Sequence, residues 1–132
     1  MLAAGVGCRA NCDVEELVRA LTAALQSAAR DLAEVHAIYA PDFKRDERCL
    51  ALVAGRVGKP VIWLSMGELE KHSRRALTFS ERVVQRFGVP SIAETAALAG
   101  ARALSPAAVA VRLLGPRTVH GGATCALAEP ER

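Results

Sequence analysis

Two apolar patterns alternate along the first half of the chain, and this alternation restricts it to one class of fold. Short apolar runs typical of buried strands lie at 2–6, 34–40 and 61–64. Between these runs, residues 14–25 and 49–57 place apolar side chains three or four positions apart, which is the spacing of a helix that packs by one face. Strand, helix, strand, helix, strand predicts right-handed βαβ units, and therefore parallel strands in one sheet.

Polar residues at the predicted helix starts support these boundaries. Asp13 and Glu16 have the spacing of a capping box, in which two side chains satisfy the first backbone N–H groups of a helix. Asp46 is expected to be the N-cap of the second helix, which Gly58 and Pro60 end in the usual order. Three more capping boxes are predicted in the second half of the chain: Ser65 with Glu68, Thr78 with Glu81, and Ser91 with Glu94.

Further apolar runs at 107–114 and 123–128 predict two strands near the C-terminus. Between them, His120-Gly121-Gly122 offers the positive φ angles of a tight hairpin turn, so these strands should pair antiparallel. Residues 129–132 are expected to form a frayed tail. The predicted fold is a single domain over 1–132, a three-layer α/β/α sandwich with a mixed, mostly parallel sheet of about five strands and a C-terminal antiparallel hairpin.

Composition and charge exclude several classes of function. Hydrophobic residues make up 52% of the chain, aromatic residues only 4%, and the formal net charge is +3. So small a charge and so few aromatic rings for stacking argue against nucleic-acid binding. No apolar stretch approaches the roughly 18 residues of a membrane span, and the first residues do not have a signal-peptide pattern. We therefore expect a soluble, cytoplasmic protein with no membrane partner.

The four cysteines are expected to be reduced and free of metal. Cys49 and Cys125 lie in strongly apolar patterns, where a reduced Cys behaves as a small core residue. Cys8-x₃-Cys12 can be drawn with His120 and Cys125 as a zinc site. The spacing is poor and there is no second close pair, so we predict no metal site.

A relaxed dinucleotide-binding fingerprint is present as Gly5-x-Gly7-x-x-Ala10. The acidic residue that should follow it is Asp42, which lies 32 residues after Ala10. The fingerprint places this residue only about 20 positions on. A nucleotide-binding domain is therefore a minor alternative, and no cofactor is predicted.

The carboxyl ends of the predicted parallel strands are the expected place for a ligand. The segments that follow these ends are 5–11, 41–47 and the turn that starts at Ser65. Each leads into a helix N-terminus, where unpaired N–H groups favour an anion, and Arg9 and Lys44 add positive charge. This edge of the sheet should suit a polyanion.

Each part of this proposed site also has a structural interpretation. Gly5 and Gly7 fit a tight turn alone as well as a turn that a ligand approaches. Asp46 is explained by its N-cap role without any function. Asp42 and Lys44 belong to a charge run and suit a surface ion pair as well as they suit a site. From the sequence, these alternatives stay open.

Five motifs follow one another along nearly the whole chain. In chain order they are Gly5-Val6-Gly7-Cys8-Arg9, 42–47, 65–69, 88–96 and 116–126. Their order resembles that of the CobE proteins and the C-terminal domain of CbiG, a family of cobalamin biosynthesis. Two positions depart from the family pattern, since Asn11 replaces a usual glycine and Arg117 replaces a usual lysine.

The resemblance implies a protein that binds or carries a polycarboxylate precorrin or corrin intermediate, with other enzymes of the corrin pathway as partners. CbiG proteins carry additional N-terminal sequence and are associated with opening a precorrin lactone. The alternative is therefore a lactone hydrolase or a ring-contraction accessory enzyme, with Asp46 or Glu47 as general base. The ligand-binding residues expected from the motifs and the strand ends are Gly5, Gly7, Cys8, Arg9, Asp42, Lys44, Ser65, Ser91, Arg117, Gly121, Gly122 and Thr124.

Overall fold

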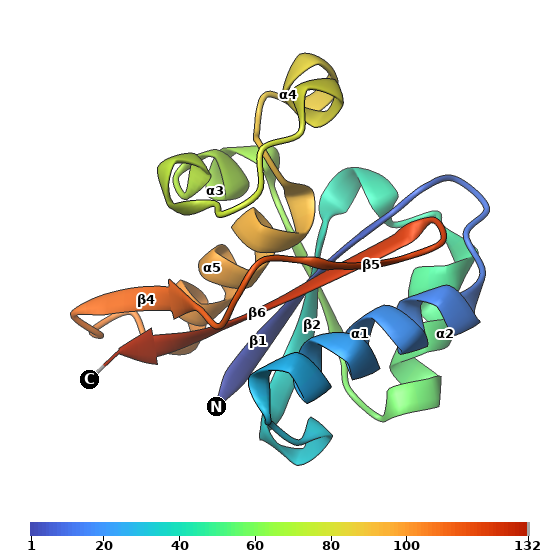
Figure 1. Cartoon of the computed structure of the whole chain (residues 1–132), viewed down its shortest axis with the longest axis horizontal. Helices are drawn as coiled ribbons and strands as arrows, with labels where there is room; N and C mark the ends of the chain where they lie inside the picture. Colours follow the sequence, from blue (N-terminus) through green and yellow to red (C-terminus); the bar gives the residue numbers. More distant parts are fainter. Residues whose placement is uncertain (132) are drawn as a thin grey trace.

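A computed structural model describes residues 1–131 and shows a mixed sheet between two layers of helices (Figure 1). The strands are β1 Leu2–Cys8, β2 Val35–Pro41, β3 Val61–Leu64, β4 Ala110–Leu113, β5 Thr118–His120 and β6 Ala123–Glu131. The helices are α1 Val14–Ala28, α2 Arg48–Val57, α3 Met66–Glu70, α4 Glu81–Phe87 and α5 Ile92–Leu104. Short 3₁₀ turns lie at Leu32–Glu34, Asp42–Lys44 and Ser73–Arg75.

Five of the strands lie in the order β3-β2-β1-β6-β4. The short strand β5 lies off this path and pairs with β6. The pairs β1–β2 and β2–β3 are parallel, whereas β6 runs antiparallel to β1, β4 and β5. β6 is therefore the strand that runs against the others in this six-stranded sheet. The α/β class and the mixed sheet are confirmed. The C-terminal hairpin joins β5 to the first residues of β6, and β5 is a strand that was not predicted. β4 pairs with the last residues of β6.

Two hydrophobic cores lie on the two faces of the sheet. On one face, α1 and α2 contribute buried leucines and valines such as Leu17 and Val53. On the other face, α5 buries mainly alanines, including Ala93 and Ala97. These small side chains let α5 approach β1 so closely that a Cβ atom on Gly5 would lie 2.1 Å from the backbone oxygen of Ala93. Gly5 is therefore required for helix-to-strand packing.

The glycine-rich segment after β1 differs from the expected loop. β1 continues through Gly7 to Cys8, and neither Gly5 nor Gly7 has a positive φ angle. The left-handed residue is instead Asn11, with φ 61°, at the position where the resemblance implies a glycine. Asn tolerates this region better than most residues, so the departure is compatible with the turn.

Four predicted caps are wrong or incomplete, one of which is the box of Ser91 and Glu94: Ser91 caps α5, but the Glu94 side chain does not close the box. The N-cap of α2 is Glu47 and not Asp46, because the 3₁₀ turn before it continues through a hydrogen bond from Glu47 N to Lys44 O, 3.0 Å. α4 is capped by Ser80 and not by Thr78. Asp13 caps α1 by accepting from Glu15 N, but no capping box closes there because the Glu16 carboxylate bonds elsewhere. The box formed by Ser65 and Glu68 is confirmed.

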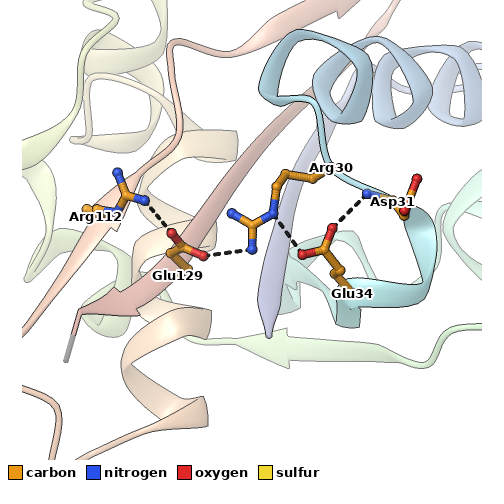
Figure 2. A network of polar contacts seen from close by, with 5 residues as sticks. All are labelled: Arg30, Asp31, Glu34, Arg112 and Glu129. Carbon is orange, nitrogen blue, oxygen red and sulfur yellow. Dashed lines mark hydrogen bonds and ion pairs between the residues drawn. The ribbon is translucent and has the colours of Figure 1, made fainter.

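Residues 129–131 belong to β6, where they pair with β4, and do not form a frayed tail. Figure 2 shows Glu129 of β6 between Arg30, which follows α1, and Arg112 of β4. Arg30 also bonds Glu34 at 2.8 Å, and Glu34 accepts from the backbone of Asp31. The network ties the last strand to the end of the first helix. Arg132 lies outside the described residues.

Because of this network, part of the free energy of unfolding should depend on pH. Burial alone would raise the pKa of Glu129, but hydrogen bonds from Arg30 and Arg112 lower it below its usual value. The pKa of Glu34 is also lowered, chiefly by the hydrogen bond from the Asp31 N–H. A carboxylate with a lowered folded pKa stabilises the fold above its unfolded pKa of about 4.3 and loses this contribution as the pH falls through the folded pKa.

Arg30→Ala should therefore lower the free energy of unfolding by about 1 kcal/mol at pH 7, with a smaller difference from the parent protein below pH 4. Urea unfolding at pH 7 and pH 3 measures this difference. An equal loss at both pH values would show that Arg30 acts by packing and not by charge.

Candidate ligand-binding site

A pocket of about 470 Å³ opens at the carboxyl end of β1, and its lining includes residues of α4 and of the β5–β6 hairpin. The cationic side chains that line it are Arg9, Lys44, Arg82, Arg86 and Arg117. The larger apolar side chains in the lining are Val83, Phe87, Ile92 and Val119. Among the described residues, no Asp or Glu belongs to the lining. Such a lining suits an anion that also has an apolar body.

The sheet topology explains how distant parts of the chain meet here. Because β6 runs antiparallel to β1, its first residue, Ala123, pairs with the last residue of β1, Cys8. Just beyond this pair, Arg9 N donates to Gly122 O at 2.8 Å. The segment that carries Arg9 is therefore fastened to the hairpin tip by backbone hydrogen bonds.

Glu16 of α1 holds the hairpin tip from the other side. Its Oε2 accepts from Gly122 N at 2.7 Å. Gly121 has φ 56°, a backbone conformation that favours glycine, and a Cβ atom there would lie 2.5 Å from the Glu16 carboxyl carbon, so Glu16 would have to shift. Thr124 Oγ1 donates to Gly7 O at 3.3 Å and adds a contact between the strands. The pocket wall made by the hairpin is thus preorganised.

Glu47 connects the loop after β2 to the loop after β1. Its Oε1 lies 3.8 Å from Lys44 Nζ, and its Oε2 accepts from Asn11 N at 3.2 Å. Asp46 is exposed, and neither acidic residue lines the pocket. Both oxygens of Glu47 are engaged in holding loops, whereas a general base needs access to the proton it removes. The catalytic roles of Asp46 and Glu47 stay a prediction.

The contribution of α4 was not anticipated from the sequence. Arg82 and Arg86 are four residues apart on one face, and Val83 and Phe87 repeat the same interval beside them. The Arg86 guanidinium lies 5.4 Å from the Phe87 ring centroid, and the Phe87 ring stacks on Phe43 at 5.0 Å. The four-residue spacing is the sequence feature that could have predicted a role for α4 in the pocket. Charged residues at this spacing on a short helix normally indicate only a solvated face.

Comparison with known proteins identifies the family. A model described as Cobalamin synthesis G C-terminus matches residues 2–128, which is nearly the whole chain. The chain belongs to this family. It is a cobalamin biosynthesis protein of the CobE and CbiG group. A search of the curated proteins found no match.

Solved structures agree with this assignment. CobE, a protein from the cobalamin (vitamin B12) biosynthetic pathway, is 36% identical with a TM-score of 0.90, over 100% of this chain and 93% of its own. Cobalamin biosynthesis protein chiG from Agrobacterium tumefaciens str. C58 is 29% identical with a TM-score of 0.73, over 100% of both chains. A cobalamin biosynthesis protein G homolog from Sulfolobus solfataricus is 17% identical with a TM-score of 0.67, over 98% of this chain and 37% of its own, and shares the fold.

The structure brings together most of the residues that the family motifs suggested. Those that line the pocket are Gly7, Cys8, Arg9, Lys44, Arg117, Gly121, Gly122 and Thr124. Gly5 packs under α5, Asp42 is exposed, Ser65 caps α3, and Ser91 is buried as the N-cap of α5. Ser65 lies outside the pocket because its strand, β3, is separated from β1 by β2. Contact of any of the twelve with a ligand stays a prediction.

Three of the four free cysteines lie close together behind the pocket. Cys8 and Cys12 both contact the buried Cys49, and Cys8 also lines the pocket. Burial and the Cys49 thiol raise the pKa of Cys8 to about 12, and burial with the Cys49 contact also raises the pKa of Cys12. Burial alone raises the pKa of Cys125 to about 12. Within residues 1–131, no group of three metal-ligating side chains has the arrangement of a metal site.

Burial predicts slow thiol chemistry at Cys49 and Cys125, and the raised pKa of Cys125 adds to its protection, since the thiolate is the reactive form. At pH 7.5 a thiol reagent should leave Cys49 and Cys125 unmodified in the folded protein and modify all four cysteines in urea. Mass spectrometry of the labelled protein before and after unfolding measures this. Rapid modification of Cys125 in the native state would contradict the predicted protection.

Within the part of the chain that the structure describes, no helix is both long enough and apolar enough to cross a bilayer.

Proposed function

We propose that this chain binds a polycarboxylate corrin-pathway intermediate in the pocket beside β1 and passes it to another enzyme of the pathway. The observation that carries the proposal is the lining itself. Arg9, Lys44, Arg82, Arg86 and Arg117 converge on one pocket from loops far apart in the sequence and from α4. The net charge of the chain is only +3, so five cationic side chains around one pocket are a local concentration of positive charge.

The chemistry of the intermediates matches this lining. They carry acetate and propionate carboxylates around a large ring with apolar faces. Guanidinium and ammonium groups form charge-assisted hydrogen bonds with carboxylates, and Arg does so in a bidentate way. Phe87 and Val83 supply apolar surface for the ring. Membership of a cobalamin biosynthesis family supports the choice of a corrin over other polyanions.

A titration followed by absorbance tests the proposal. Cobyrinic acid, a corrin with free carboxylates, should bind the purified protein, and its affinity should fall as salt increases. Dicyanocobinamide, in which the corresponding side chains are amides and no nucleotide loop or phosphate is present, is the control and should bind much more weakly. Equal affinity for the two corrins, or an affinity that does not change with salt concentration, would contradict a site that recognises its ligand by charge.

The same sample distinguishes binding from catalysis. A precorrin lactone incubated with the protein should be bound but not opened, because neither Asp46 nor Glu47 lines the pocket. Release of the two-carbon fragment on turnover would instead support the lactone hydrolase.

A further inference from the structure

Glu94 is a fully buried carboxylate beneath the pocket, and every contact to its oxygens comes from a donor. The side chain projects from the first turn of α5 and has no exposed surface. Oε1 accepts from the backbone N–H groups of Leu77 and Thr78 at 2.9 and 2.8 Å. Oε2 accepts from Thr78 Oγ1 at 2.7 Å and from Arg117 N at 2.9 Å. One carboxylate thus fastens two loops to one helix.

The local sequence motif does not account for this use of Glu94. Glu68 stands in the same position of α3, three residues after a capping serine, and its Oε1 accepts from Ser65 N at 3.2 Å to close a capping box. In α5 only half of the box forms, since Ser91 Oγ accepts from Glu94 N at 3.3 Å. The Glu94 side chain turns away from its own helix terminus and reaches the loops.

One fastened loop carries a cation of the pocket, and the other leads into the helix that carries two more. Arg117 itself lines the pocket, and its backbone N–H is the group that Glu94 binds. The next residue, Thr118, donates its hydroxyl to Ala20 O of α1 at 2.7 Å, so the backbone at Arg117 is held from both helical layers.

The second loop leads directly into α4. Two residues after Thr78, Ser80 donates its N–H to Pro90 O at 3.0 Å and caps α4, which carries Arg82 and Arg86. α4 has no fully buried residue of its own, so its place beside the pocket depends strongly on such anchors.

We propose that Glu94 is a positioning residue of the ligand site, which sets the place of Arg117 and of α4 around the pocket without touching the ligand. This inference rests on the proposed function of the pocket. Its physical basis is that a carboxylate can accept all four hydrogen bonds, whereas an amide of the same size would direct N–H groups at donors. Buried donors left without an acceptor would then shift both loops.

Glu94→Gln and Glu68→Gln form a matched pair for the test, because both alter a glutamate at the same position of a helix. Glu94→Gln should weaken cobyrinic acid binding by about 10- to 100-fold, the range typical when a group that orients binding residues is removed. It should also reduce the slope of affinity against salt, since Arg117 no longer contributes fully. Glu68→Gln should change neither quantity.

A double-mutant cycle separates positioning from a general loss of stability. Arg117→Ala removes the guanidinium but keeps the backbone N–H, so in that background Glu94→Gln should cost less affinity than it does alone. If urea unfolding shows that the variants are equally stable and the two fold-losses of affinity simply multiply in the double variant, the proposal is overturned. If Glu94→Gln does not fold, Thr78→Val removes one of the four donors and should cause a smaller loss in the same direction. Parent-like binding by Thr78→Val would then overturn it.

A readout without ligand keeps this proposal distinct from the proposed function. Amide hydrogen exchange at Thr78 and Arg117 should accelerate in Glu94→Gln while the middle of α5 stays protected. If the parent protein does not bind cobyrinic acid, the proposed function fails. If the parent binds and Glu94→Gln exchanges and binds like the parent, only the positioning role of Glu94 fails.

Discussion

Replacing Gly5 with alanine is expected to remove a large part of the folding free energy, by ~3 kcal/mol or more. The added Cβ would lie 2.1 Å from Ala93 O and 2.3 Å from Ala97 N, and both are backbone atoms that cannot rotate away. α5 would have to move off β1, which opens the core made by its alanines. A domain of this size is stable by only about 5–15 kcal/mol, so the effect should be obvious in urea unfolding.

Gly55 provides the matched control for this substitution. It lies in the exposed interior of α2, and nothing is within 4 Å of the position of its missing Cβ. Gly55→Ala should therefore stabilise the protein by about 0.5–1 kcal/mol, because alanine is the better helix former. A Gly5→Ala protein as stable as the Gly55→Ala protein would show that the close approach of α5 to β1 is wrong.

Arg9→Ala and Lys44→Ala are each expected to weaken cobyrinic acid binding by about 10- to 150-fold. A charge-assisted contact to a carboxylate contributes roughly 1.5–3 kcal/mol when it is partly shielded, and each 1.4 kcal/mol corresponds to a factor of ten. Both side chains line the pocket, and the loops that carry them are joined through the Glu47 hydrogen bond to Asn11. Absorbance titration of each variant measures the loss.

The control for these two variants must be a cation without a structural role. Arg30 is unsuitable, because its ion pairs with Glu34 and Glu129 hold the last strand. Arg19 is exposed on α1 and does not line the pocket, so Arg19→Ala should bind like the parent. A loss at Arg19 as large as at Arg9 would place the site elsewhere or reduce it to general charge attraction.

Much of the site could be predicted because its parts lie at strand ends. Arg9 and Lys44 follow two parallel strands, and such ends must meet at one edge of a sheet. Gly121 and Gly122 were recognised from the hairpin turn. Arg82 and Arg86 were not, because four-residue spacing on a helix is the same whether the helix faces solvent or a pocket.

The sequence by itself determined the order of elements in the first half of the chain, the parallel first three strands and the family, since these depend on apolar spacing and on motifs that can be read residue by residue. Only the tertiary structure decided what the acidic residues do. Glu16, Glu94 and Glu129 look like two capping residues and a tail, yet each holds a segment distant in the chain. A carboxylate accepts from whichever donor the fold brings within about 3 Å, and local sequence does not contain that information.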